Sequence, residues 1–136
     1  MEVMNYPKNF TEWNEQKPVV HAKDQSRIYF REREIWFLTC GVNVGFEQDG
    51  KGEQFARPVI ILKKFNWQIF WGIPLTTSQK EGKYYFHFEY KNGKLSNAIL
   101  SQLRLFDSRR LIKKDGTIDQ VNFVVLKTKI RELIAP

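Results

Sequence analysis

The sequence contains only one cysteine, Cys40, among its 136 residues. A single cysteine excludes an internal disulfide framework and is typical of a protein that folds in a reducing compartment. We interpret Cys40 as a small hydrophobic core residue. The two histidines, His21 and His87, lie far from it and from each other in the sequence. We therefore expect no metal site and no cofactor.

Long apolar runs are also absent. No run approaches the roughly 18 residues that a membrane-spanning helix requires. The first residues show no basic stretch followed by an apolar one, which a signal peptide would have. We therefore expect a cytoplasmic protein with no membrane partner. There are no internal repeats or low-complexity tracts, and the length suits one domain that buries its core without disulfides.

Acidic residues are fewer than basic ones, at 15 against 22, which leaves a formal net charge of +7. This balance favours an anionic partner, such as a nucleic acid, an acidic protein or a membrane surface. Aromatic residues make up 15% of the chain. Aromatic side chains favour β-strands and also stack on nucleic-acid bases.

The chain divides into an N-terminal extension, residues 1–32, and a barrel domain, residues 33–136. The extension is predicted to hold a short helix over 11–17, with Thr11 as its N-cap and Pro18 ending or kinking it. Phe10, Trp13 and Phe30 are expected to pack it on the domain. The alternative is a flexible tail.

Apolar and alternating segments predict five strands, over residues 34–40, 59–62, 69–75, 83–90 and 98–105. Asn92-Gly93 is a strong signal for a two-residue hairpin, and Asp115-Gly116 predicts another turn. A helix is expected from about 118 to 134, with Thr117 and Gln120 as a capping box. Its apolar stripe would comprise Val121, Val124, Val125, Ile130, Leu133 and Ile134.

These elements predict an α+β, mainly β fold. We expect a small, strongly bent antiparallel sheet or partly open barrel, with helices packed outside it.

Polar groups gather where the predicted strands meet loops, between Gly45 and Ser78. Glu47 and Gln48 lie in a long glycine-rich loop, 41–56, and Arg57 begins the strand that follows it. The next strand ends at Thr76, which is followed by Thr77 and Ser78. Catalytic groups often occupy such positions, because the strand fixes them and the loop gives access.

Four blocks of the sequence resemble a known family. They are Glu34-Ile35-Trp36; Gly45-Phe46-Glu47-Gln48 with Arg57-Pro58-Val59-Ile60-Ile61; Ile73-Pro74-Leu75-Thr76-Thr77-Ser78; and Ile99 to Asp107 with Arg110-Leu111. In order and spacing these are similar to the MazF/PemK toxins of bacterial toxin–antitoxin systems. The resemblance covers residues 34–134 and leaves out the N-terminal 32 residues.

The resemblance implies an SH3-like barrel of the type that MazF shares with the CcdB gyrase poisons. It implies a metal-independent endoribonuclease that cleaves single-stranded mRNA. In this family the 2′-hydroxyl attacks the adjacent phosphorus and leaves 2′,3′-cyclic phosphate and 5′-hydroxyl ends. Arg57 and Thr76 match the family's main catalytic pair, and Glu47 matches a glutamate with a catalytic role in some members. A homodimer, with RNA across its interface, and an acidic antitoxin partner are also implied.

The chemistry of these residue types suits that reaction. Arg57 offers a rigid fork that fits two phosphate oxygens, and Thr76 can donate a further hydrogen bond to the charge that develops there. Arginine is a poor general base because its pKa exceeds about 12, so Glu47 is the more natural proton acceptor. Ser101 stands where some PemK-type members have an acid, which adds weight to Glu47.

RNA-binding residues are expected around this centre. The candidates are Gln48, Lys51, Thr77, Ser78, Lys80, Gln102 and Arg104, with Phe46 and Phe55 stacking on bases. Each also has a plain structural interpretation, as a solvated charge, a β-former or a cross-strand polar pair.

Two other functions remain open from the sequence. One is a non-catalytic gyrase poison like CcdB, although the C-terminus lacks the Trp-Gly-Ile tail of that protein. The other is an RNA-binding module on the same fold. Fold alone does not separate these.

Overall fold

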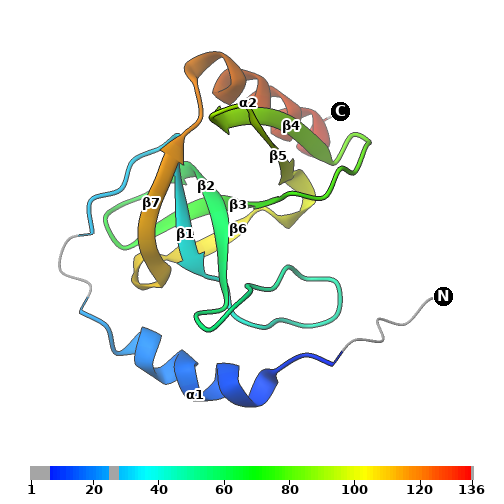
Figure 1. Cartoon of the computed structure of the whole chain (residues 1–136). Coiled ribbons are helices and arrows are strands. Elements are labelled where there is room, and N and C mark those ends of the chain that lie inside the picture. The colour runs from blue at the N-terminus through cyan, green and yellow to red at the C-terminus, as the bar shows by residue number, and fades with distance from the viewer. Residues whose placement is uncertain (1–6, 25–27, 136) are drawn as a thin grey trace.

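The computed structural model describes residues 7–24 and 28–135 (Figure 1). Two α-helices, two short 3₁₀ helices and seven strands follow one another along the described chain. In order they are α1 (Phe10–His21), β1 (Glu34–Thr39), β2 (Ala56–Lys64), β3 (Ile69–Thr76), β4 (Tyr85–Lys91), β5 (Lys94–Ile99), η1 (Leu100–Gln102), β6 (Arg104–Asp107), η2 (Ser108–Arg110), β7 (Leu111–Thr117) and α2 (Gln120–Ile134). The α+β, mainly β fold class is confirmed.

The strands form one antiparallel sheet that bends into a partly open barrel, in the order β4-β5-β3-β2-β1-β7. The strand β3 makes the bend possible because it changes partner along one edge. Its first half, Ile69–Gly72, pairs with β6, and its end, Leu75 and Thr76, pairs with β5. Pro74 lies between these two pairings, so neither β5 nor β6 needs an N–H from it.

The strand β2 runs through the centre of the sheet and is buried on both faces. Ile60 and Leu62 belong to one hydrophobic cluster, which also contains residues of β4, β5 and α2. Val59 and Ile61 belong to a second cluster, with residues of β1, β3 and β6. The continuous apolar run predicted this double burial. Because packing on both faces holds β2 rigid, the backbone of Arg57, near the beginning of this strand, has a fixed position.

The helix α2 covers one end of the barrel with a different face from the predicted one. Its buried residues are Phe123, Leu126 and Ile130. Val121 is 74% exposed and Ile134 76%, so the predicted stripe is wrong except at Ile130 and the partly buried Leu133. The predicted capping box is also wrong. Asp119 caps the helix instead, and its carboxylate accepts the N–H of Asn122 at 2.8 Å.

Two predicted local features take other forms. The segment 98–105 is not one strand, because the 3₁₀ turn η1 separates β5 from β6 and redirects the chain from one end of β3 to the other. Asp115-Gly116 is no turn but lies in β7, next to a bulge in the pairing with β1. Gly116 is needed there since a β-carbon would lie 2.7 Å from the Tyr90 ring. The hairpin at Asn92-Gly93 is confirmed, with positive φ at both residues.

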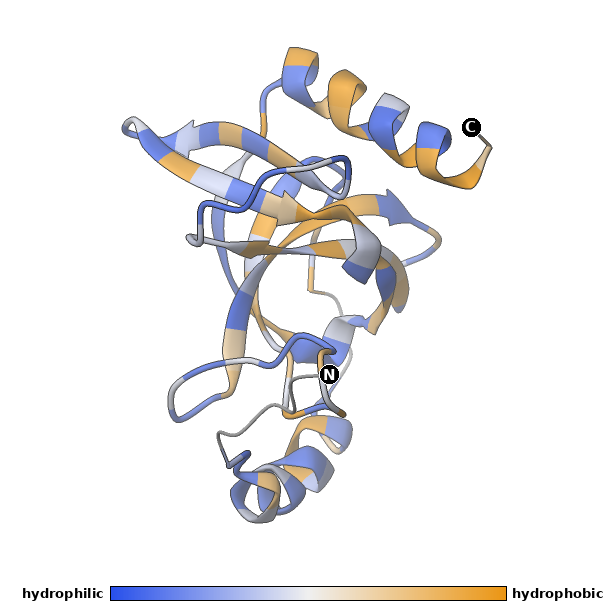
Figure 2. Cartoon of the chain, turned by 90° about the vertical axis from the view of Figure 1, so that its right-hand side faces the viewer, coloured by the Kyte–Doolittle hydropathy of each residue, from blue (hydrophilic) through white to orange (hydrophobic). Residues whose placement is uncertain are grey.

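The helix α1 lies at the opposite end of the barrel from α2 (Figures 1 and 2). It is longer than the predicted 11–17 helix. Asn9 caps it rather than Thr11, and Pro18 lies inside it. Trp13 is buried as expected, whereas Phe10 remains 45% exposed. Within the described residues, neither helix has the length and apolar character to cross a membrane.

Candidate active site

A pocket of about 270 Å³ opens where β2 and β3 meet the loop 41–56. We name it the Arg57 pocket. Lys51, Arg57, Thr76 and Thr77 are among the residues that line it. The antiparallel register pairs Val59 with Pro74, and continuing it by two residues brings Arg57 opposite Thr76. The two predicted catalytic residues therefore lie together on adjoining strands.

The Arg57 guanidinium is held by two backbone carbonyl groups. Its Nε donates to the carbonyl oxygen of Asp49 at 2.7 Å, and its Nη1 donates to that of Leu75 at 2.9 Å. Asp49 belongs to the loop and Leu75 to β3, so this side chain bridges the two. A guanidinium carries five N–H donors in a rigid plane, which lets one arginine be held by backbone and bind an anion as well.

The Thr76 hydroxyl has a defined orientation. Its Oγ1 accepts the backbone N–H of Ser78 at 3.2 Å, in the local turn that Thr and Ser commonly form at strand ends. A hydroxyl that accepts one hydrogen bond still has its own hydrogen to donate. Thr76 is half-buried at the pocket wall, so this hydrogen can be directed to an oxygen atom in the pocket.

A second pocket, of about 560 Å³, contains other predicted site residues. We name it the Gln102 pocket. Glu47, Gln48, Gln102 and Arg104 line it. It lies near Arg57, because Arg57 Nε donates to the carbonyl of Asp49, the residue that follows Gln48 of this pocket. The structure thus places Glu47 apart from Arg57 and Thr76, in the neighbouring pocket.

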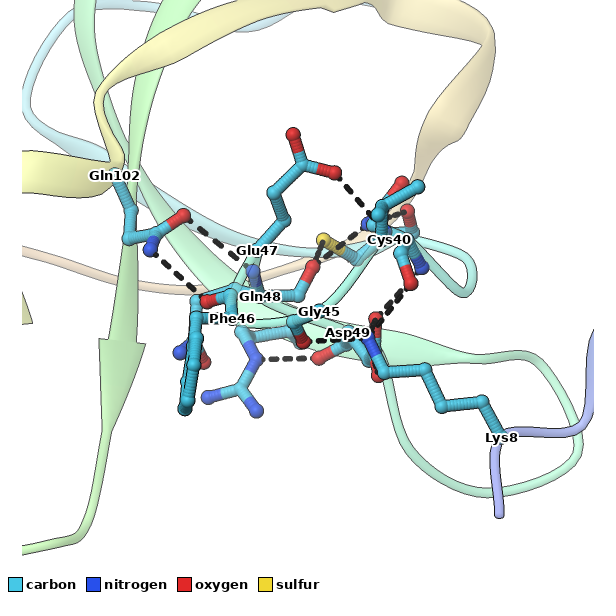
Figure 3. Close-up of polar contacts among 11 residues, drawn as sticks. Lys8, Cys40, Gly45, Phe46, Glu47, Gln48, Asp49 and Gln102 are labelled. Atoms are coloured by element: carbon cyan, nitrogen blue, oxygen red, sulfur yellow. Dashed lines mark hydrogen bonds and ion pairs between the residues drawn. The ribbon is translucent and has the colours of Figure 1, made fainter. Parts of the chain in front are cut away.

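Side-chain contacts give the loop 41–56 one defined conformation (Figure 3). The amide of Gln102 spans it, accepting from the N–H of Gln48 at 3.4 Å and donating to the carbonyl of Phe46 at 3.3 Å. The Glu47 carboxylate accepts the N–H of Val44 at 2.9 Å and stays exposed. Gln102, predicted as an RNA-binding or cross-strand residue, is therefore in direct contact with the loop.

The remaining predicted residues lie on the loop after β3. Ser78 and Lys80 line neither pocket, and both are exposed. The buried Asn97 of β5 holds this loop, since its Nδ2 donates to the carbonyls of Ser78 at 3.2 Å and Lys80 at 3.1 Å.

The two phenylalanines predicted to stack on bases differ in exposure. Phe46 is 71% exposed, as a stacking residue requires, but Phe55 is 6% exposed. The stacking role predicted for Phe55 is therefore wrong.

The Arg57 pocket also contains residues that the sequence did not reveal. Tyr90, Lys94 and Asp115 line it. The Tyr90 hydroxyl donates to Asp115 at 2.7 Å, and Lys91 donates to the same carboxylate at 2.6 Å. Burial and the neighbouring carboxylate raise the pKa of Tyr90. No local signal marks these residues, because Tyr90 and Asp115 lie on different strands and 25 residues apart.

Burial and three arginines act in opposite directions on the Cys40 thiol, which lines the Gln102 pocket. Burial raises the pKa of the Cys40 thiol although Arg104, Arg57 and Arg110 lower it. The thiol therefore stays neutral and acts as a core group, as predicted. Burial, with the charge of Arg104, lowers the pKa of Arg110, whose Nη1 donates to the carbonyl of Thr39 at 2.9 Å. Among the described residues, no three His, Cys, Asp or Glu side chains gather as metal ligands.

Several solved MazF-type structures share this fold. MazF from Deinococcus radiodurans aligns with a TM-score of 0.67 and 16% identity, over 81% of this chain and all of that one. An endoribonuclease in complex with its cognate antitoxin, from a mycobacterial species, gives 0.60 and 12%, over 79% and 98%. Mycobacterium tuberculosis toxin MazF-mt6 gives 0.59 and 15%, over 75% and 96%. No curated protein matches the sequence significantly.

The family profile of the PemK-like, MazF-like toxins of type II toxin–antitoxin systems matches residues 31–134. The chain therefore belongs to this family, which confirms the resemblance seen in the sequence. The match begins after α1, so the first 30 residues lie outside the family profile.

Proposed function

We propose that this protein is the toxin of a toxin–antitoxin system and acts as a metal-independent endoribonuclease on single-stranded mRNA. One observation carries the proposal: Arg57 and Thr76 line one pocket from adjoining strands. Family membership supports the reaction class. The pocket supports the reaction site, since a guanidinium and a hydroxyl can together donate hydrogen bonds to the phosphoryl oxygens of a phosphodiester.

In the proposed reaction, the ribose 2′-oxygen forms a bond to the adjacent phosphorus and the bond to the 5′-oxygen breaks. The 5′-oxygen leaves and takes up a proton from solvent water, so the products are a 2′,3′-cyclic phosphate and a 5′-hydroxyl end. Negative charge grows on the phosphoryl oxygens as the new bond forms. Arg57 and Thr76 stabilise that charge as donors already in place, and one such donor is worth roughly 3–4 kcal/mol of barrier in other enzymes.

Glu47 remains the proposed acceptor of the 2′-hydroxyl proton, and this assignment makes a geometric demand. The carboxylate lies in the Gln102 pocket. The scissile phosphate must therefore lie in the Arg57 pocket with its ribose directed towards Glu47 in the Gln102 pocket. The carbonyl of Asp49, two residues after Glu47, contacts Arg57, so the loop already brings the two groups into one neighbourhood.

RNA would follow the two pockets. Lys51 and Thr77 line the Arg57 pocket and would contact phosphate near the cleavage point. Gln48, Gln102 and Arg104 line the Gln102 pocket and would hold the neighbouring nucleotide. Ser78 and Lys80, on the exposed loop beyond β3, would contact the strand farther along. The formal charge of +7 supports an anionic ligand of this kind.

Two protein partners belong to the proposal. The antitoxin partner is supported by structural neighbours that include toxin–antitoxin complexes. An acidic, partly disordered antitoxin would compete with RNA for the same basic surface. The toxin itself would act as a homodimer, with RNA across the interface between protomers.

The test is to incubate the purified protein with a long RNA in EDTA and analyse the fragment ends. The proposal predicts discrete cuts with 5′-hydroxyl and 2′,3′-cyclic phosphate termini. RNA retained without cleavage would instead support a binding module. Inhibition of DNA gyrase without RNA cleavage would support a CcdB-like poison.

A further inference from the structure

The N-terminal extension contacts the loop 41–56 at several points. We propose that it is a brace that orders this loop and thereby positions the Arg57 guanidinium, with Lys8 as the principal positioning residue. The inference rests on the proposed function for its catalytic consequence. Its structural part stands on the contacts alone.

The Lys8 ammonium group lies at the centre of the loop (Figure 3). Its Nζ donates to the carbonyl oxygens of Asn43 at 2.6 Å and Gly45 at 2.8 Å. It also forms an ion pair with the Asp49 carboxylate at 3.1 Å. A lysine ammonium has three N–H donors, so these acceptors match its full capacity. Its side chain is only 6% exposed, which makes this a buried contact between segments 35 or more residues apart.

The contact with Lys8 leads directly to Arg57. The Asp49 carboxylate binds Lys8 and also accepts the N–H of Asn43 at 2.7 Å. The carbonyl of the same Asp49 accepts from Arg57 Nε at 2.7 Å. Fixing the Asp49 side chain therefore also fixes the carbonyl that orients the guanidinium. Asp49 alone therefore links Lys8 of the extension to the Arg57 guanidinium.

Hydrophobic packing supports the same part of the loop. Trp13 of α1 forms a separate buried cluster with Val42 and Phe55, which lie at the two ends of the loop. The Trp13 and Phe55 rings are 5.7 Å apart. Gly41 lies directly against the indole ring, where a β-carbon would collide with it. Gln16, one turn farther along α1, donates to the carbonyl of Glu53 at 2.6 Å.

These contacts come from residues that lie outside the family profile. The family profile begins at residue 31, and both Lys8 and Trp13 precede it. A loop with exposed backbone and few apolar contacts opens at low free-energy cost. The extension provides the missing contacts, so the loop keeps one conformation before RNA binds. Such preorganisation matters because small misplacements of a catalytic group lower the rate steeply.

The experiment compares Lys8→Met with Lys17→Met in the full-length protein. Lys17 lies exposed on α1, so its replacement removes the same charge from the same segment without touching the loop. The first readout is hydrogen exchange of the loop amides and of the Arg57 Nε–H, measured by NMR without RNA. We expect Lys8→Met to speed both by about tenfold or more, the scale of one lost charge-assisted bond. Lys17→Met should match wild type.

The second readout is steady-state RNA cleavage. We expect Lys8→Met to lower kcat about 10- to 100-fold and to change KM by less than about threefold, the pattern of a displaced catalytic group. The variant Asp49→Asn keeps the backbone carbonyl, and its effect on exchange should not add to that of Lys8→Met.

The two readouts separate the possible failures. Unchanged exchange at the loop and at Arg57 Nε–H in Lys8→Met would overturn the brace, whatever the cleavage rate. Faster exchange with wild-type kcat would overturn the positioning role. If the wild-type protein cuts no RNA, the proposed function fails, and exchange of the Arg57 Nε–H still decides whether Lys8 positions the guanidinium.

Discussion

The carbonyl oxygen of Asp49 accepts a 2.7 Å hydrogen bond from Arg57 Nε. This bond joins the loop 41–56 to β2, and the Arg57 Nη1 bond to Leu75 continues to β3 at 2.9 Å. The candidate catalytic arginine is thus a point where three segments meet. Its position depends on the loop conformation as well as on the sheet.

Gly50, the next residue in that loop, provides a direct test of this dependence. A β-carbon at Gly50 would overlap the carbonyl group of Phe55, so Gly50→Ala must displace the loop. We expect RNA cleavage to fall by about tenfold or more and the free energy of unfolding to fall by about 1–3 kcal/mol. Cleavage kinetics and urea denaturation would measure the two effects.

The matched control is Gly52→Ala in the same loop. A β-carbon there meets no atom within 4 Å, although φ is +74°. Its cost should be limited to backbone strain of about 1–2 kcal/mol, with cleavage close to wild type. Equal loss of cleavage in both variants would contradict the link between Gly50 and Arg57.

Thr76 provides the test of the second proposed donor. Thr76→Val keeps the shape of the side chain and removes its hydroxyl group. We expect kcat to fall about 100-fold, by analogy with loss of one donor to a developing oxyanion, while Thr76→Ser retains most activity. Thr128→Val, on the exposed face of α2, is the control. Wild-type kcat in Thr76→Val would remove this residue from the reaction.

Much of this fold could be predicted from the sequence, because its central strands have strong local patterns. The apolar runs at 59–62 and 69–75 and the Asn92-Gly93 turn define β2, β3 and the β4–β5 hairpin. The prediction failed where tertiary contacts decide the local structure. The chain breaks at Leu100–Gln102 because β3 pairs with different strands at its two ends. Gly116 is required because the Tyr90 ring packs closely against it, and it does not form a turn.

The candidate site was predictable only in part, for a similar reason. Arg57 and Thr76 stand at strand ends, and pairing of neighbouring strands brought them together. Glu47 lies in a loop whose path no periodicity specifies, and the structure places it in the Gln102 pocket. Lys8 could not be predicted, because its acceptors lie 35 or more residues away and are mostly backbone carbonyls.

The Asp115 carboxylate gives a prediction for pH dependence. Burial alone would raise its pKa, but hydrogen bonds from Lys91 and Tyr90 outweigh this effect and lower it. A carboxyl group with a lowered folded-state pKa stabilises the fold above its unfolded pKa of about 3.9. This contribution is lost as the pH falls through the lower, folded value. Stability from Asp115 should therefore be complete at pH 7 and decline in strong acid.

The measurement is urea denaturation of Asp115→Asn and wild type between pH 7 and pH 2. We expect the variant to be less stable by about 1–2 kcal/mol at pH 7, the scale of hydrogen bonds to a charged group, reduced by the solvent around the half-exposed Lys91. The difference should shrink at the lowest pH. A difference that stays constant with pH would contradict the assignment.

Arg104 should bind phosphate through charge. It lines the Gln102 pocket, and its guanidinium lies 4.6 Å from the centre of the Phe106 ring. We expect Arg104→Gln to weaken RNA binding and to reduce the slope of log affinity against log salt by about 0.7, the value for one contact to a single strand. Fluorescence anisotropy at several salt concentrations would measure this, with Lys127→Gln on α2 as the control. An unchanged slope would show that Arg104 makes no phosphate contact.

The single-turnover rate of RNA cleavage by Arg57→Ala tests the central claim most directly. Arg109→Ala is its matched control, since Arg109 pairs with Asp107 away from both pockets. The account predicts a loss of about 100- to 1000-fold for Arg57→Ala and a rate near wild type for Arg109→Ala, in EDTA, with 5′-hydroxyl ends on every product. Cleavage by Arg57→Ala at the wild-type rate would contradict it.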